Sequence, residues 1–166
     1  MSIYLPSLDA LPPNSVVLVY DLEAIGNVQQ PENCFMWNLS AMVLDDKNKV
    51  FDQFIEPPVD HIPEPPNPKL FKVTHNFLRN ANARPATEVL SFFFKWVSNL
   101  YNPNEGGIIL LVSHGNFRFD QPLMQTEIIR NQIIVPPNVY FFDSLHWFRT
   151  IKKKLRSYSL SNLYKQ

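Results

Sequence analysis

Short apolar runs separated by turn residues occupy the first third of the chain and predict three β-strands. The first spans Val16–Leu22, where β-branched residues favour a strand. The second lies in the aromatic-rich stretch Cys34–Leu44, and the third covers Lys49–Ile55. The polar cluster Asp45–Asn48 separates these two strands and predicts a hairpin turn. The three strands should therefore form a meander.

Helical spacing begins only after a proline-rich connector. Glu56–Pro68 contains six prolines, which exclude a helix or a central strand in that segment. A short helix or helical turn is expected within Lys69–Leu78. Apolar residues then recur at helical spacing over Pro85–Tyr101, and the proline suits the first turn of that helix.

Strands and helices alternate in the remainder of the chain. The expected elements are a strand over Ile108–Ser113, a helix over Phe119–Asn131, a strand over Asn138–Phe142, a helix over Asp143–Arg156 with Asp143 as N-cap, and a last short helix capped by Ser157 or Ser159. This order predicts an α/β fold with a mixed sheet of about five strands flanked by helices. The first strand should be central and lie beside the strand at 108–113. We expect one domain over residues 1–166, with residues 1–14 as an irregular lead-in.

Composition limits the class of protein. Hydrophobic residues make up 45% of the 166 residues, as in an ordinary globular domain. No apolar run is long enough to span a membrane, and the N-terminus lacks the features of a signal peptide. The single cysteine, Cys34, excludes an internal disulfide and is expected to be a small core residue. We therefore expect an intracellular protein, either cytoplasmic or nuclear.

Charge is unevenly distributed although the formal net charge is zero. Residues 1–70 carry 10 acidic and 3 basic side chains, whereas residues 71–166 carry 5 acidic and 12 basic ones. The densest basic segment is Arg149–Arg156, which suits either a solvated helix face or contact with phosphate groups. Such asymmetry is typical of proteins with nucleic-acid partners.

Two carboxylates end the first strand. Asp21 and Glu23 are spaced i, i+2, so in a strand both side chains point to the same face. A third carboxylate, Asp120, follows the strand at 108–113, and we expect all three to meet at the strand ends. Carboxylates without a cysteine or histidine cluster favour hard ions such as Mg²⁺ or Mn²⁺. The alternative is that Asp21 and Glu23 are ordinary exposed carboxylates and that Asp120 caps a helix.

Several short segments, taken in order, resemble the DEDD superfamily of 3′–5′ exonucleases. Tyr20–Gly26 (Tyr-Asp-Leu-Glu-Ala-Ile-Gly) resembles the first motif, and Ser113–Asp120 resembles the second motif, His-Asn-x-x-Phe-Asp. Phe71–Thr74 and Phe142–Leu145 resemble segments that lie between and after these motifs. Arg156–Leu163 resembles a Ser-Tyr-x-Leu-x-x-Leu segment of the histidine-containing (DEDDh) branch.

This resemblance implies a ribonuclease H-like fold and a two-metal mechanism with two Mg²⁺ or Mn²⁺ ions. It implies that Asp21 bridges both ions, that Glu23 ligates one ion and orients the attacking water, and that Asp120 serves the other ion. The implied partner is the 3′ end of single-stranded DNA or RNA. The residues implied to lie beside the terminal nucleotide are Leu22, Ala24, Asn116 and Phe119. His114 is expected in a core or supporting role rather than a catalytic one.

Three departures from the family pattern qualify the expected activity. Ile25 stands where Thr is usual and Asn27 where Leu is usual, and both should alter the grip on the 3′ end. The His-x-x-x-x-Asp motif is missing, since no histidine follows His146 and no acidic residue follows Asp143. We therefore predict a domain of an exonuclease, of which this chain is a shortened form. The alternatives are an inactive relative that binds nucleic acid or protein, and a phosphodiesterase that clears short oligonucleotides.

Overall fold

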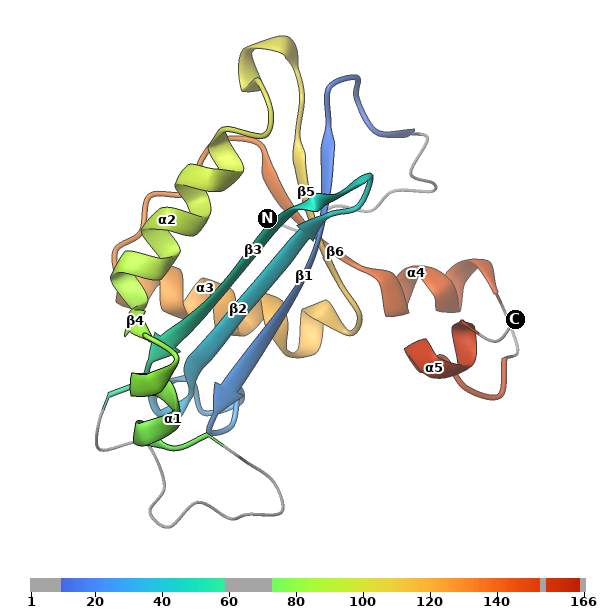
Figure 1. Cartoon of the computed structure of the whole chain (residues 1–166). Coiled ribbons are helices and arrows are strands. Elements are labelled where there is room, and N and C mark those ends of the chain that lie inside the picture. The colour runs from blue at the N-terminus through green and yellow to red at the C-terminus, as the bar shows by residue number, and fades with distance from the viewer. Residues whose placement is uncertain (1–9, 59–72, 153–154, 165–166) are drawn as a thin grey trace.

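The computed structural model describes residues 10–58, 73–152 and 155–164, and its centre is one six-stranded sheet (Figure 1). The strands are β1 (Val16–Ile25), β2 (Phe35–Val43), β3 (Asp46–Glu56), β4 (Arg84–Pro85), β5 (Ile109–Ser113) and β6 (Val139–Asp143). Their order is β4-β3-β2-β1-β5-β6. The pairs β1–β2 and β2–β3 are antiparallel, and the other three pairs are parallel. The predicted mixed sheet with a central first strand beside β5 is confirmed.

The sheet differs from the sequence prediction in three places. The two-residue strand β4 adds a sixth strand, where Arg84 and Pro85 lie beside the end of β3. Strand β1 runs on to Ile25, because its pairing with β2 continues past both carboxylates. Strand β3 already begins at Asp46, so the expected four-residue turn is shorter.

The described chain has five α-helices, and each falls where a helix was expected. They are α1 (His75–Asn80), α2 (Ala86–Ser98), α3 (Asp120–Arg130), α4 (Ser144–Ile151) and α5 (Leu160–Leu163), with 3-10 turns at Pro31–Asn33, Pro103–Glu105 and Asn116–Arg118. Helix α4 is shorter than predicted and ends at Ile151, with Lys152 at its C-cap position. Most of the proline-rich connector, and both Lys153 and Lys154, lie outside the described residues. None of the described helices combines the length and apolar character that a membrane span requires.

Helices α2 and α3 cover one face of the sheet and form the main core with it. Alternate residues of β1 point to this side, among them Leu18, Tyr20 and Leu22, and all three are buried. Phe93 of α2 is fully buried against them. Cys34 is also buried in this core, as predicted.

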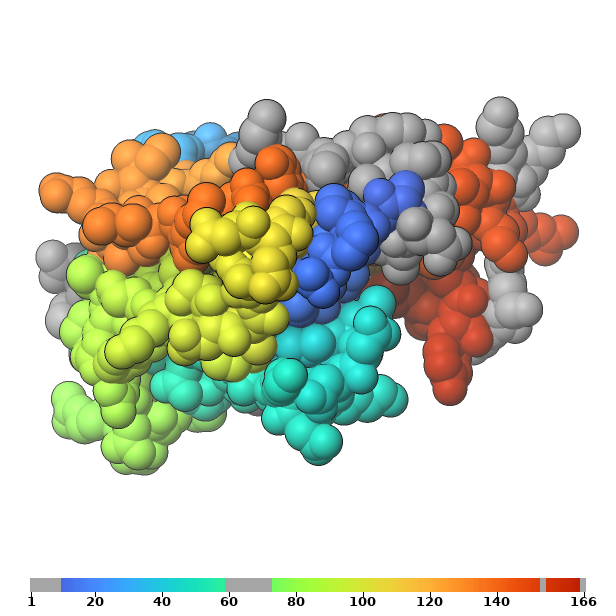
Figure 2. Space-filling view, turned by 90° about the horizontal axis from the view of Figure 1, so that it is seen from above, coloured from blue at the N-terminus to red at the C-terminus, as the bar shows by residue number. Residues whose placement is uncertain are grey.

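The opposite face of the sheet is covered only in part. Helix α1 packs at one end through Leu78, which joins a small cluster with Ile25. Trp147 of α4 packs near Phe142 at the other end. Helices α4 and α5 extend beyond β6, at the opposite end of the molecule from α2 (Figures 1 and 2). Between these two ends, no other described element covers the middle of β1, β2 and β3, where Val50 is 53% exposed.

Candidate active site

Asp21 and Glu23 lie side by side on the open face of the sheet. Burial alternates along β1, so the two carboxylates are exposed while Tyr20, Leu22 and Ala24 are buried on the core side. The sequence prediction that Asp21 and Glu23 share a face is confirmed. Asp21 lies opposite Ser40 of β2, and Glu23 lies opposite Asn38.

A hydrogen-bonded polar group continues from these carboxylates across the open face. Asp52 of β3 lies opposite Ser40, and its Oδ1 accepts from Ser40 Oγ at 2.7 Å and from Asn38 Nδ2 at 3.0 Å. Ser40 Oγ also lies 2.9 Å from Asn38 Oδ1. This group was not predicted from the sequence, although Asn38 and Ser40 are spaced i, i+2 on a strand and so share a face. A shallow pocket of about 200 Å³ lies over this region and is lined partly by Asp21, Ser40 and Asp52.

Asp120 reaches the same region from the first residue of α3. Strand β5 pairs with β1 only from Val16 to Val19, so the backbone of β1 beyond that point has no strand on this side. The backbone N–H of Leu22 donates to Asp120 Oδ1 at 3.1 Å instead. Ser113, the last residue of β5, donates its hydroxyl to Asp120 Oδ2. Asp120 is therefore buried and held between the ends of β1 and β5.

All three carboxyl groups are easier to protonate than usual. Burial raises the pKa of Asp21 above its ordinary value. Burial also raises the pKa of Glu23, and the neighbouring charge of Asp21 adds to this effect. Burial raises the pKa of Asp120 as well, even though the hydrogen bonds from Ser113 and Leu22 favour its ionised form. A cation close to these groups would offset the free-energy cost of their ionised forms.

The three carboxylates carry no cationic partner and no complete set of metal ligands among the described residues. None of the ion pairs in that part of the chain includes Asp21, Glu23 or Asp120. No group of three or more histidine, cysteine or acidic residues there is close enough to hold a metal ion. Mg²⁺ usually keeps several waters and takes only one or two protein carboxylates together with substrate phosphates. The exposed pair Asp21 and Glu23 is a donor set of that kind.

The turn before Asp120 is fixed by buried polar groups. Asn116 is fully buried, and its Oδ1 accepts from the Tyr20 hydroxyl at 2.5 Å. Its Nδ2 donates to the carbonyl of Phe142 at 2.9 Å and to that of Leu111 at 3.4 Å. The side chain of Asn116 is therefore engaged inside the protein and does not face solvent, where the resemblance implied a contact with the terminal nucleotide.

Asp143 holds this turn from the other side. Its carboxylate accepts from the backbone N–H groups of Gly115 at 3.0 Å and Phe117 at 3.1 Å. The same carboxylate accepts from Leu145 N and His146 N at the start of α4, so the predicted N-cap is confirmed. Asp143 thus connects the turn that carries Asp120 to the first turn of α4.

The other residues singled out from the sequence are divided between the core and the surface. The side chains of Leu22 and Ala24 are buried, whereas Phe119 is 37% exposed next to Asp120. His114 has its Nε2 2.7 Å from the carbonyl oxygen of Tyr158 and its Nδ1 3.1 Å from Ser144 Oγ. These contacts tie the segment before α5 to the end of β5, which agrees with the supporting role expected for His114.

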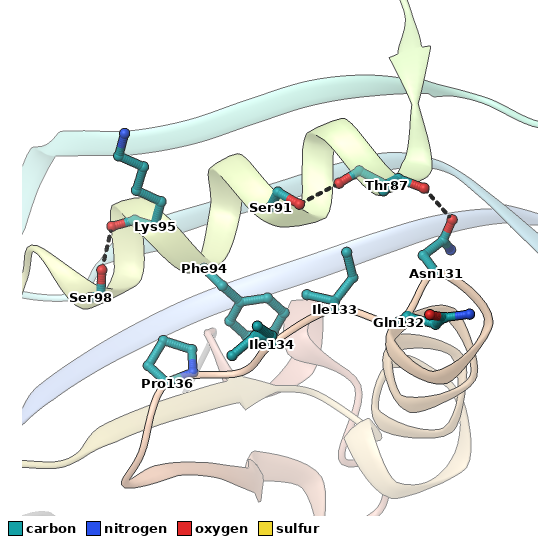
Figure 3. A pocket seen from close by; sticks show the side chains of 10 residues that line it. All are labelled: Thr87, Ser91, Phe94, Lys95, Ser98, Asn131, Gln132, Ile133, Ile134 and Pro136. Carbon is teal, nitrogen blue, oxygen red and sulfur yellow. Dashed lines mark hydrogen bonds between the residues drawn. The ribbon is translucent and has the colours of Figure 1, made fainter.

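A second, larger hollow lies on the opposite side of the sheet from Asp21. This groove of about 550 Å³ runs between α2 and residues 131–136, and Phe94, Ile133 and Pro136 are among the residues that line it (Figure 3). Its hydroxyl groups are used internally, since Ser91 Oγ donates to the Thr87 carbonyl at 2.7 Å and Thr87 Oγ1 donates to Asn131. None of the described residues that line this groove is acidic, so they lack the chemistry expected at the candidate site.

Comparison with known proteins identifies the fold. No protein-family model matches the chain, and no curated protein matches it in sequence. Among solved structures, E. coli Exonuclease I in complex with a 5cy-dA13 oligonucleotide superposes with a TM-score of 0.67 at 16% sequence identity, over 91% of this chain and 36% of that chain. E. coli Exonuclease I in complex with a dA16 oligonucleotide gives a TM-score of 0.62 at 17% identity, over 82% of this chain and 29% of that one. The fold is therefore the ribonuclease H-like exonuclease fold, and the chain spans about a third of the length of these neighbours.

Proposed function

We propose that this chain carries a metal-dependent 3′–5′ exonuclease domain that acts on single-stranded nucleic acid. One observation supports this proposal most strongly: Asp21 and Glu23 share one face of β1 without an ion pair among the described residues, and Asp120 is anchored to the backbone N–H of Leu22 between them. The sheet that carries them has the fold of Exonuclease I. Its DEDDh character rests on the resemblance of the segment around Tyr158, and its 3′ polarity rests on the two motifs that contain the carboxylates.

The substrate class follows from the structural neighbours and from the site. The neighbouring Exonuclease I structures hold dA13, dA16 and dT13 oligonucleotides. We propose that the ligand of this chain is likewise single-stranded DNA, or single-stranded RNA. The open sheet face beside Asp21 has no covering element among the described residues, so a flexible strand has room to reach the carboxylates.

Asp21 and Glu23 would hold Mg²⁺ or Mn²⁺ directly, and Asp120 would supply a further carboxylate oxygen from the first residue of α3. Each carboxylate oxygen of Asp120 accepts one hydrogen bond and retains a second lone pair. A bound pair of such ions would activate a water and stabilise charge on the attacking and leaving oxygens. Ser113 and Leu22 fix the direction of the Asp120 carboxylate. Tyr20, Asn116 and Asp143 hold β1 and the turn in register behind it.

The direct test is degradation of a 5′-labelled single-stranded oligonucleotide in Mn²⁺. Glu23→Ala and Asp21→Ala should each lower the rate by about 10²- to 10³-fold, since metal-ion contributions of several kcal/mol correspond to such factors. Asp45→Ala is the matched control, because Asp45 is an exposed carboxylate in the β2–β3 turn and should leave the rate unchanged. Shortening from the 5′ end, or equal rates for all three variants, would refute the proposal.

A second function is favoured by one observation. Both oxygens of Asp120 already accept hydrogen bonds, and no three-ligand group exists among the described residues. A domain that binds single-stranded nucleic acid without cutting it would need no more than this. Oligonucleotide binding with no loss of label from either end, in Mg²⁺ and in Mn²⁺, would establish that function in place of the exonuclease.

A further inference from the structure

Three aromatic side chains meet at the edge of the open sheet face. Trp37 of β2 and Phe54 of β3 have nearly parallel rings, 4° apart with centroids at 6.2 Å. Phe77 of α1 meets Phe54 edge-on, with ring centroids at 5.3 Å and an interplanar angle of 87°. Phe77 is 41% exposed, so the cluster presents an aromatic ring to solvent.

Core packing explains two members of this cluster but not the third. The small core under α1 is built from the buried residues Ile25, Val73 and Leu78, and Trp37 and Phe54 pack against it. Phe77 is adjacent to Leu78 in the helix, but it is 41% exposed and joins the cluster through its contact with Phe54. The indole Nε1 of Trp37 is buried and has no hydrogen-bond partner among the described residues, which costs stability rather than adding to it.

The cluster shares a row of the sheet with one of the candidate metal ligands. Glu23 lies opposite Asn38, and Asn38 lies opposite Phe54, so the three side chains project from one face in successive strands. Strands are spaced by about 4.8 Å, which places Phe54 about 10 Å from Glu23. The Phe77 ring centroid lies a further 5.3 Å from that of Phe54. Stacked nucleotides rise by about 3.4 Å each, so a span of about 10–15 Å from Glu23 to Phe77 corresponds to about three to four nucleotides.

The charges on this face determine how a nucleic acid strand could bind there. Glu23 lies in the same row as Phe54, and Asp21 and Asp52 lie in the next row, on either side of Ser40. These carboxylates repel phosphates, and neither row contains a basic side chain among the described residues. Stacking of bases on aromatic rings provides affinity that does not depend on charge, at about 1–3 kcal/mol per base.

We propose that Phe77, supported by Phe54, is a stacking site for a nucleobase about three to four nucleotides upstream of the 3′ end. This site rests on the proposed function, because the 3′ end must lie at Asp21 and Glu23. The ring takes any base, since every base presents a π-face, and it positions the strand without contacting the reacting phosphate.

The experiment measures binding rather than cleavage. A single-stranded 13-mer with a 5′ fluorophore is titrated with the protein in EDTA, and the dissociation constant is obtained from anisotropy. Phe77→Ala should weaken binding by about 5- to 100-fold, which is the factor that corresponds to one lost stack. Phe77→Trp should bind within about 2-fold of wild type. Phe77→Leu retains apolar bulk for folding but should lose affinity as Phe77→Ala does.

Phe92→Ala is the matched control. Phe92 is 46% exposed on α2, which covers the opposite face of the sheet, so its removal should leave the dissociation constant unchanged. A second arm moves a single abasic nucleotide along the 13-mer. Wild type should lose affinity when the abasic nucleotide is about three to four positions from the 3′ end, and Phe77→Ala should lose nothing further there.

The outcomes separate the stacking site from the proposed function. Wild type that binds the 13-mer while Phe77→Leu and Phe77→Ala bind equally well overturns the stacking site alone. If the abasic nucleotide weakens the binding of Phe77→Ala as much as it weakens the binding of wild type, the stacking site is also overturned. Wild type that binds no oligonucleotide in EDTA overturns the stacking site, whereas the proposed function is overturned separately, by the degradation assay in Mn²⁺.

Discussion

Replacing Asp143 by Ala should destabilise the fold far more than an ordinary surface substitution. The buried carboxylate accepts four backbone N–H groups: Oδ1 serves Gly115, Leu145 and His146, and Oδ2 serves Phe117. Loss of the N-cap of α4 costs about 1 kcal/mol. Leaving the two turn amides without an acceptor costs about 1–3 kcal/mol each. The expected loss is therefore about 3–7 kcal/mol, and each kcal/mol lowers Tm by roughly 2–4 °C for a domain of this size.

Urea unfolding followed by far-ultraviolet circular dichroism measures this loss. Asp143→Asn keeps an oxygen for the three Oδ1 bonds but presents an amide N–H₂ to the Phe117 N–H, so it should cost about 2 kcal/mol. Asp45→Ala, at an exposed carboxylate, should stay within about 0.5 kcal/mol of wild type. A loss below about 1 kcal/mol for Asp143→Ala, with an unchanged urea slope, would refute the view that Asp143 holds the turn and the helix together.

Three further outcomes are expected. Gly26→Ala should lower the free energy of unfolding in urea by about 3 kcal/mol or more, because Gly26 has φ +102° and an added Cβ would lie 2.1 Å from the Asn33 carbonyl oxygen. Gly106 has φ +78° but no atom within 4 Å of an added Cβ, so Gly106→Ala should cost only about 1 kcal/mol. Equal costs for the two variants would contradict this. Burial raises the pKa of Glu127 above 4.5 although Arg130 opposes this, so wild-type stability from this group is greatest below about pH 4.5 and is lost as the pH rises through the raised pKa. The free energy of unfolding of wild type minus that of Glu127→Gln should therefore fall from pH 4 to pH 8. A rise of this quantity with pH would contradict the prediction. Calorimetric Mn²⁺ affinity should fall from about pH 7 to about pH 5, because protons compete at carboxyl groups whose pKa values burial has raised; a constant affinity would exclude them as ligands.

The positions of the main strands and helices could be predicted from the local pattern of apolar residues, whereas the residues at which these elements end could not. Apolar runs located β1 and β5, and helical spacing located α2. The end of β1 depended on its partner, because β2 keeps pairing with it to Ile25. Strand β4 has no pattern of its own, since it consists of Arg84 and Pro85 aligned by the end of β3. Such pairing depends on tertiary position, which short sequence windows do not contain.

The candidate site was predictable where strand geometry alone determines it. The spacing of Asp21 and Glu23 fixes their shared face in any strand. The burial of Asn116 was not predictable, because it depends on Gly115, whose φ of +87° turns the chain so that the next side chain enters the core. The partners Tyr20 and Ser113 were missed because each reads as an ordinary strand residue. Only the packed structure places their hydroxyls beside Asn116 and Asp120.

The Leu22 amide is a natural reporter for the candidate site. Its N–H lies beyond the point where β5 leaves β1 and is protected by a side chain, Asp120, rather than by a neighbouring strand. Hydrogen exchange at this one amide therefore follows the orientation of Asp120, while exchange at Val17 and Val19 follows the opening of the sheet. Any ligand that turns the Asp120 carboxylate away from β1 would accelerate exchange at Leu22 alone. Amide-resolved exchange could thus detect occupancy of the site without substrate, turnover or a label.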